Sequence, residues 1–132
     1  MRSVREHSEC GAITVWTAVA LIGFIVIIGI GVDFTGHTKA TQEARSIAAE
    51  AARAGHQHLK LTNGHLNPKP DIAKQAAEKY VAASRFRGAA QVIGDNTIEV
   101  KVTGEYTCMF LNIIGITTLP VRAEGTSKLH SS

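Results

Sequence analysis

Aromatic residues and clustered charges are scarce in this sequence of 132 residues. Phenylalanine, tyrosine and tryptophan make up 5% of it, and the formal net charge at pH 7 is only +3. Basic residues alternate with acidic ones, as Glu99 with Lys101 and Arg122 with Glu124. A nucleic-acid interface would need a basic stripe with interleaved aromatic side chains. The sequence therefore predicts no nucleic-acid partner.

Only two cysteines are present, which excludes the disulfide framework of a small secreted domain. Cys10 precedes a long apolar run, and Cys108 lies far beyond it. If that run spans a membrane, the two thiols lie on opposite sides of about 30 Å of hydrocarbon and cannot pair within one chain. We interpret them as unpaired thiols with no shared role.

The patterns of a catalytic or cofactor site are also missing from the sequence. It contains no nucleophile constellation, no paired carboxylate motif and no phosphate-binding loop. The Gly-Ile-Gly fragment at residues 29–31 lies inside the apolar run, so it is no dinucleotide fingerprint. His56, His58 and His65 lack a carboxylate or cysteine at ligand spacing, and we expect them in a solvated loop. No catalytic residue, cofactor or metal is predicted, and no enzyme activity.

One long apolar run, AITVWTAVALIGFIVIIGIGV at residues 12–32, carries neither charge nor proline. As a helix it would cover about 30 Å, the thickness of a bilayer core. A soluble protein of this size could not surround it, and a cleaved secretory signal would have a shorter core followed by an A-x-A-like site. We predict a single-pass membrane protein with residues 1–11 as a cytoplasmic stub or leader and an extracytoplasmic C-terminal domain.

A stripe of small residues spaced four apart continues the helix beyond the apolar run. Its members, predicted as a helix-packing face, are Gly36, Ala40, Ala44, Ala48 and Ala52. Such stripes let helix backbones approach closely in membranes and at protein contacts, although a merely alanine-rich helix of high propensity shows the same pattern. One helix is predicted from about residue 12 to about residue 57, with residues 33–57 as a stalk.

A linker and a short second helix should follow the stalk. Residues 58–70 hold an Asn-Gly pair and two prolines, which are typical of turns. Asp71 is placed to cap the helix that follows. Its predicted apolar face contains Ile72, Ala76, Tyr80 and Val81.

Strands are predicted in the last third of the chain. Residues 97–103 alternate apolar and polar side chains, which is typical of a half-buried strand. A turn at residues 95–96 joins it to a shorter strand at 91–93, and a final strand begins at 119, where Pro120 indicates an edge position. The fold class is therefore α+β, with the short helix packed on a small antiparallel sheet in a head at residues 71–132.

Residues 108–116, CMFLNIIGI, form an apolar loop whose period fits neither a helix nor a strand. If exposed, the loop would mark a contact with a partner or with the membrane surface. If folded in, it would belong to the core. The sequence leaves both alternatives open.

Three stretches of the sequence carry a resemblance to a known family. They are CGAITV at residues 10–15, GVDF at 31–34 with the alanine-rich run at 44–55, and FLNIIGI at 110–116 leading into LPVRAEGT at 119–126. In order and spacing they resemble the TadE/TadG-like family, small pilin-like proteins of tight-adherence (Flp) pilus machines. The resemblance covers nearly the whole chain.

The resemblance implies a long helix, half in the membrane, and an αβ head outside the cytoplasm. Family members are described as minor pilins or pseudopilins that help to assemble, prime or tip an adherence filament. The implied partners are the membrane, other pilin-like subunits, pilus or secretion assembly proteins, and a prepilin peptidase that would cut between Gly11 and Ala12. We expect an accessory membrane subunit of such a pilus or a related secretion machine. The alternative is a membrane-anchored scaffold or sensing domain that never enters a filament.

The fate of the leader depends on Trp16. Pilins of this kind usually carry a glutamate five residues after the cut to balance a freed N-terminal amine, and Trp16 supplies no carboxylate there. We expect the leader to be retained, with cleavage after Gly11 as the alternative. Intact mass after co-expression with the cognate peptidase should be that of the full chain, 14.1 kDa. A mature N-terminus at Ala12 would refute retention and favour the filament tip as the subunit's position.

Overall fold

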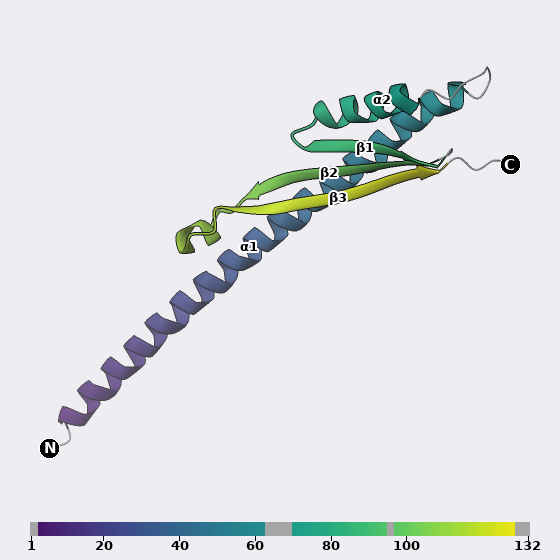
Figure 1. Ribbon diagram of the computed structural model, residues 1–132. Coiled ribbons are helices and arrows are strands. Elements are labelled where there is room, and N and C mark those ends of the chain that lie inside the picture. The colour runs from purple at the N-terminus through teal and green to yellow at the C-terminus, as the bar shows by residue number, and fades with distance from the viewer. Residues whose placement is uncertain (1–2, 63–69, 95–96, 129–132) are drawn as a thin grey trace.

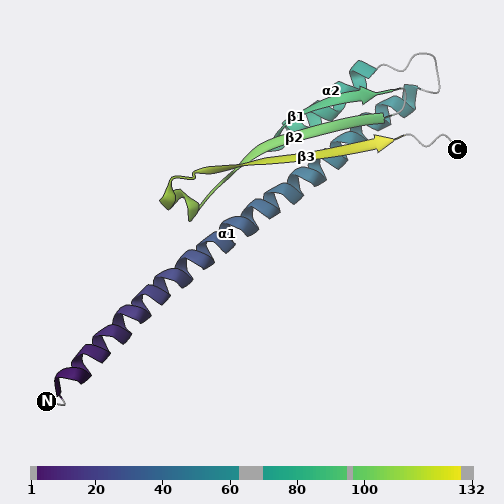
Figure 2. The same ribbon diagram turned by 60° about the horizontal axis from the view of Figure 1, so that its bottom comes forward.

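The computed structural model describes residues 3–62, 70–94 and 97–128, which form one long helix with a small head on its side (Figure 1). The head lies along the C-terminal half of this helix, and the N-terminal half projects alone (Figures 1 and 2). A short helix and a three-stranded antiparallel sheet make up the head. The predicted α+β architecture is confirmed.

Helix α1 spans Ser3–Thr62 without a break. It contains no proline, so its ladder of backbone hydrogen bonds is not interrupted, and its length is about 90 Å. The helix begins before the expected residue 12 and continues past the expected residue 57. The C-terminal extension is stabilised by Leu59, which is buried in the core of the head. Of the linker expected at 58–70, residues 63–69 lie outside the described part of the chain.

Helix α2 spans Pro70–Ala82, so Asp71 lies inside the first turn and not at the predicted capping position. Proline is favoured at the first helical position, because a first-turn N–H has no intrahelical acceptor to lose. Asp71 still interacts favourably with the positive end of the helix dipole.

The predicted apolar face of α2 is wrong except for Val81, which is buried as expected. The buried residues are Ala73, Ala77 and Val81, whereas Ile72 and Tyr80 are exposed. The reason is steric, since a Cβ on Gly55 of α1 would lie 2.8 Å from the Ala73 carbonyl oxygen and 3.2 Å from the Ala77 Cβ. Two helices this close leave room only for small side chains between them.

The sheet has the order β1-β2-β3, with β1 at Arg87–Ile93, β2 at Thr97–Thr107 and β3 at Thr118–Lys128. In the central strand, Val100 lies opposite Ala90 and Gly125. The predicted alternation is confirmed, because Ile98, Val100 and Val102 are all fully buried. Pro120 lies in an edge strand, as predicted, and β1 begins earlier than expected. The turn predicted at residues 95–96 lies outside the described residues.

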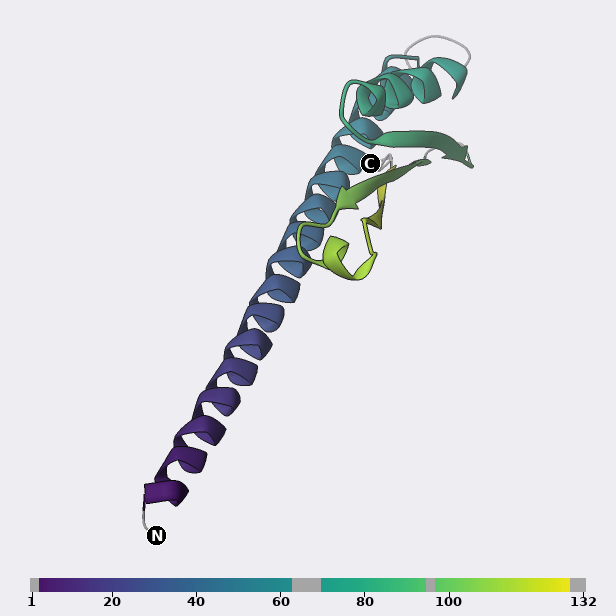
Figure 3. The ribbon, with the colours of Figure 1, turned by 90° about the vertical axis from the view of Figure 1, so that its left-hand side faces the viewer.

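The core lies between α1, α2 and the inner face of the sheet (Figure 3). Alanine supplies most of the helical side of this core. A Cβ on Gly125 would collide with the backbone of Ala48, so β3 runs directly against the backbone of α1. The small residues of the stalk therefore let a sheet, and not only a helix, approach the α1 backbone.

The contact between Gly125 and Ala48 should tolerate no added methyl group. In Gly125→Ala the new Cβ meets backbone atoms that cannot rotate away, so the head should lose roughly 1–3 kcal/mol of stability. Thermal unfolding of detergent-solubilised full-length protein, followed by near-UV circular dichroism, measures this loss. Thr126→Ala, on the exposed face of the same strand, is the matched control and should unfold within about 0.5 kcal/mol of the wild type. Equal stabilities of the two variants would contradict the packing described.

Candidate membrane-anchoring and assembly site

The N-terminal half of α1 presents apolar side chains on all sides. The large apolar residues between Ile13 and Val32 are 41% to 78% exposed, with Trp16 the most exposed of them. Among the described residues α1 is the one helix long and apolar enough to cross a membrane, with a mean hydropathy of 2.6 in its most apolar window. It fits a membrane anchor near the N-terminus.

The two residues of the expected cleavage site, Gly11 and Ala12, lie within α1 and are exposed. No side chain or other segment comes within 4 Å of the position that a Cβ on Gly11 would take. Nothing in the described head therefore covers the bond between them.

The structure places the small-residue stripe against the chain's own head. Ala40, Ala44, Ala48 and Ala52 are at most 3% exposed, and all four belong to the core shared with the sheet and α2. Gly36, one turn closer to the membrane segment, lies beneath the Tyr106 side chain, and a Cβ there would collide with the phenol. The face of the stalk that carries the stripe is thus occupied within the chain itself.

A buried carboxylate joins the end of the apolar segment to the head. Asp33, the first residue after the 12–32 run, is fully buried. Its two carboxylate oxygens accept hydrogen bonds from three consecutive backbone N–H groups of the loop between β2 and β3, those of Met109 (2.8 Å), Phe110 (2.9 Å) and Leu111 (2.7 Å). The hydroxyl of Tyr106 hydrogen-bonds to it as well. This one side chain therefore fixes a loop more than seventy residues away in the sequence.

The environment of Asp33 keeps it ionised. Burial raises the pKa of the carboxyl, but the hydrogen bonds from Leu111, Met109, Phe110 and Tyr106 outweigh burial and hold this pKa below its usual value. Burial, and after it the nearby Asp33 charge, raise the pKa of the Cys108 thiol and of the Tyr106 hydroxyl. At neutral pH the site therefore contains one buried negative charge that is stabilised by backbone and hydroxyl donors.

Two further contacts of α1 complete this junction. The ring of His37 meets Tyr106 edge-on, with ring centroids 6.4 Å apart, and its Nε2 lies 2.9 Å from the carbonyl oxygen of Pro120. A Cβ on Gly29 would lie 2.9 Å from the Phe110 ring, so the absence of a side chain there lets the loop rest on the helix. The junction thus covers about two turns of α1, from Gly29 to His37.

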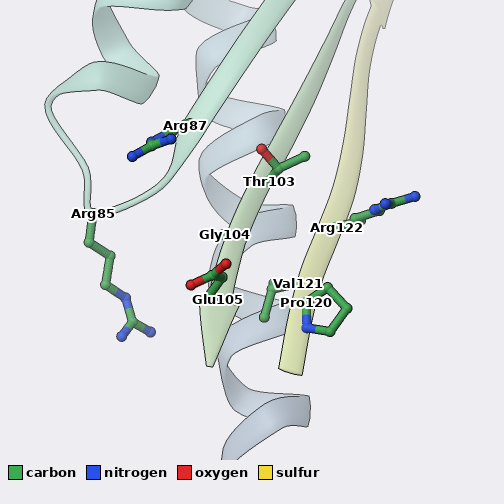
Figure 4. A pocket seen from close by; sticks show the side chains of 8 residues that line it. All are labelled: Arg85, Arg87, Thr103, Gly104, Glu105, Pro120, Val121 and Arg122. Atoms are coloured by element: carbon green, nitrogen blue, oxygen red, sulfur yellow. The ribbon is translucent and has the colours of Figure 1, made fainter. Parts of the chain in front are cut away.

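A groove of about 450 Å³ opens on the head, and Pro120 of the junction is among its lining residues (Figure 4). It is lined by Arg85, Arg87, Glu105 and Arg122 among others, and Figure 4 shows Arg87 and Arg122 pointing in opposite directions. Arg85 is bound to Glu43 at 2.6 Å and lies 4.9 Å from the centre of the Phe86 ring. These charged groups do not converge on a common point, so the groove lacks the geometry of a ligand site.

The histidines expected in a solvated loop lie partly elsewhere. His56 and His58 belong to α1, and His56 is half-buried with its Nδ1 2.8 Å from the Ser127 hydroxyl, so the expectation is wrong for His56. His65 lies outside the described residues. Within the described ranges, no three His, Cys, Asp or Glu side chains gather in the manner of a metal site.

Comparison with known proteins bears on the two helices of the chain. Residues 11–78, more than half of the chain, match the model of the TadE/G-like family of Flp pilus-assembly proteins. The chain belongs to the TadE/G-like family. The matched segment covers α1 from Gly11 onward and most of α2. No curated protein and no solved structure matches the chain.

In this TadE/G-like chain, sequence patterns did not indicate the contacts that hold the junction together. Asp33 is the first charge after the apolar run and belongs to the GVDF stretch that resembles the family, but neither signal indicated its contact with the loop. Tyr106 gave none, because its role depends on a contact with Gly36 across about seventy residues of chain. The apolar loop, which the sequence left open between core and surface, is exposed apart from Cys108 and half-buried Leu111.

Removing the charge at Asp33 should release the loop. In Asp33→Asn one carboxylate oxygen becomes an NH₂ donor that faces the backbone N–H donors, so at least one buried hydrogen bond is lost. Hydrogen exchange of the Met109, Phe110 and Leu111 amides should then accelerate by tenfold or more, on the order expected for one charged hydrogen bond. Asp71→Asn, at an exposed aspartate of α2, is the matched control and should leave these amides protected. Unchanged protection in Asp33→Asn would contradict the role assigned to this carboxylate.

Proposed function

We propose that this TadE/G-like protein is an accessory, minor-pilin-like membrane subunit of a tight-adherence pilus or a related secretion machine. It acts by assembling with other pilin-like subunits and assembly proteins, without catalysing a reaction. The short N-terminal stub lies in the cytoplasm and the head lies outside it.

The observation that carries this proposal is the uncovered apolar half of α1, continuous with a stalk whose inner face is already occupied. Residues between Cys10 and Ile28 are exposed apart from half-exposed Ala20. In a bilayer or a filament core, this surface is the part of the chain that remains available to other helices. The family match includes this helix, which supports a role in pilus assembly.

Two observations support a role without catalysis. The charged side chains of the groove point in different directions, and the Asp33 carboxylate binds the loop of its own chain. All of the contacts described for the Asp33 carboxylate are donors from the chain itself. The competing role, a membrane-anchored scaffold or sensing domain, keeps the same anchor and topology but does not place the apolar surface against pilin-like subunits.

Photocrosslinking combined with fractionation of sheared pili distinguishes the two roles. Cells that express a tagged full-length chain with a photoreactive residue in place of Ile22, which is 62% exposed within the apolar run, should yield adducts with pilin-like subunits or assembly proteins. The tagged chain should also appear in the pilus or the assembly-complex fraction. The matched control carries the photoreactive residue in place of Ala83, which is exposed on the head. A chain that is absent from every pilus and assembly-complex fraction, and that gives no such adduct from position 22, would favour the scaffold.

A further inference from the structure

The loop between β2 and β3 lies beside the end of the apolar segment that is proposed to span the membrane. Figures 1 and 3 place it at the end of the head nearest the N-terminus of α1. Phe110, Ile113 and Ile114 of the loop share an apolar hollow with Ile25, Val26 and Gly29 of α1. Gly29 and Ile25 precede Asp33 by four and eight residues, which on a helix is about 6 Å and about 12 Å toward the membrane. The loop therefore reaches below the level at which the helix turns polar.

The side chains at the tip of this loop are uncovered, and all of them are apolar except that of Asn112. Ile113 is 83% exposed, Ile114 71% and Met109 69%, and residues 108–116 contain no charge. Apolar side chains grouped in this way are unusual on a surface that faces water.

The change from apolar to polar residues occurs at the same level on α1 and on the head. On α1 the apolar run ends at Val32, and the next residue is Asp33. On the head the apolar loop is flanked by exposed Thr107, Thr117 and Thr118. The hydrogen bonds of Asp33 to the loop hold these two boundaries in register. The two boundaries therefore lie at about the same level, as the edge of a hydrocarbon layer requires, with Asn112 as a polar residue within the apolar loop.

Most backbone N–H groups of the loop are paired within the chain, which lowers the cost of placing the loop in a dry environment. Lipid-exposed irregular chain is unfavourable because each unpaired N–H or C=O group in hydrocarbon costs several kcal/mol. Asp33 accepts from three loop N–H groups, and four more donate to backbone carbonyls of residues 110–117; these four belong to Cys108, Ile113, Gly115 and Ile116. Gly115 takes up the left-handed conformation (φ 96°) that closes this short turn.

We infer that residues 108–116 insert into the leaflet on the head's side of the bilayer, with Phe110, Ile113 and Ile114 in contact with acyl chains. The partner is lipid hydrocarbon, because the loop continues the apolar surface of α1 at the same depth. This inference rests on the anchoring of α1 in the membrane and is independent of the pilus role. The head is then held against the membrane at two places, α1 and the loop.

Fluorescence depth measurements in nanodiscs that hold one full-length chain each test the insertion. In a Cys10→Ser background, whose remaining Cys108 is buried, single cysteines replace Ile113, Ile22 or Thr126 and carry an NBD label. Ile22 is the reference within the apolar run, and Thr126 is the exposed reference on the head. The label at position 113 should emit at shorter wavelength than the label at 126 and be quenched by lipids doxylated near the headgroup. It should resist quenching by aqueous iodide, which quenches the label at 126.

Each other pattern of quenching refutes the inference. If the label at 113 behaves as the one at 126 while position 22 is quenched by lipid, insertion of the loop is wrong and the anchoring of α1 stands. If position 22 is itself quenched by iodide, the anchoring fails, and the proposed function fails with it. Lipid quenching at 113 that appears only with several chains in one disc would assign the loop to a second copy of this chain and overturn the assignment to lipid. Circular dichroism of each labelled chain establishes that the fold is unchanged.

Discussion

The burial of one ionised carboxylate at the end of the apolar segment determines how the rest of the molecule is arranged. A buried charge is tolerated only when its hydrogen-bonding capacity is filled. Asp33 is supplied by three consecutive N–H groups of one loop and by the hydroxyl of Tyr106, so neither the loop nor the strand before it can move along α1 without breaking these bonds. The position of the sheet on the helix follows from this requirement.

Small residues satisfy the second requirement, that the head must approach α1 closely enough for those bonds to form. Gly29 and Gly36 leave space for the rings of Phe110 and Tyr106, and Gly125 lets β3 meet the backbone at Ala48. Farther along, Gly55 does the same for α2. The glycines lie on two different elements, α1 and β3, yet they serve one interface. The interface therefore depends on the close approach of backbones and only to a small extent on the interdigitation of large side chains.

The elements of this fold could largely be predicted from the sequence, because each has a local signature. The apolar run, the alternation of Ile98, Val100 and Val102, and the edge proline were sufficient for the α+β architecture. On the buried side of α2 only Val81 was predicted correctly, because hydrophobicity favoured Ile72 and Tyr80 while the short distance to α1 favoured alanine. The junction at Asp33 depends on hydrogen bonds between residues 76 to 78 apart, and no local pattern encodes such a contact.

The one-sided position of the loop has a consequence for neighbouring helices. Toward the N-terminus, residues 12 to 24 of α1 offer an apolar cylinder that can be approached from any direction. From Ile25 to Ile30, the loop lies beside one sector of that cylinder. A second helix that packs along the whole of α1 must therefore arrive from one of the remaining directions. The loop thus restricts the directions from which neighbouring helices can pack around α1.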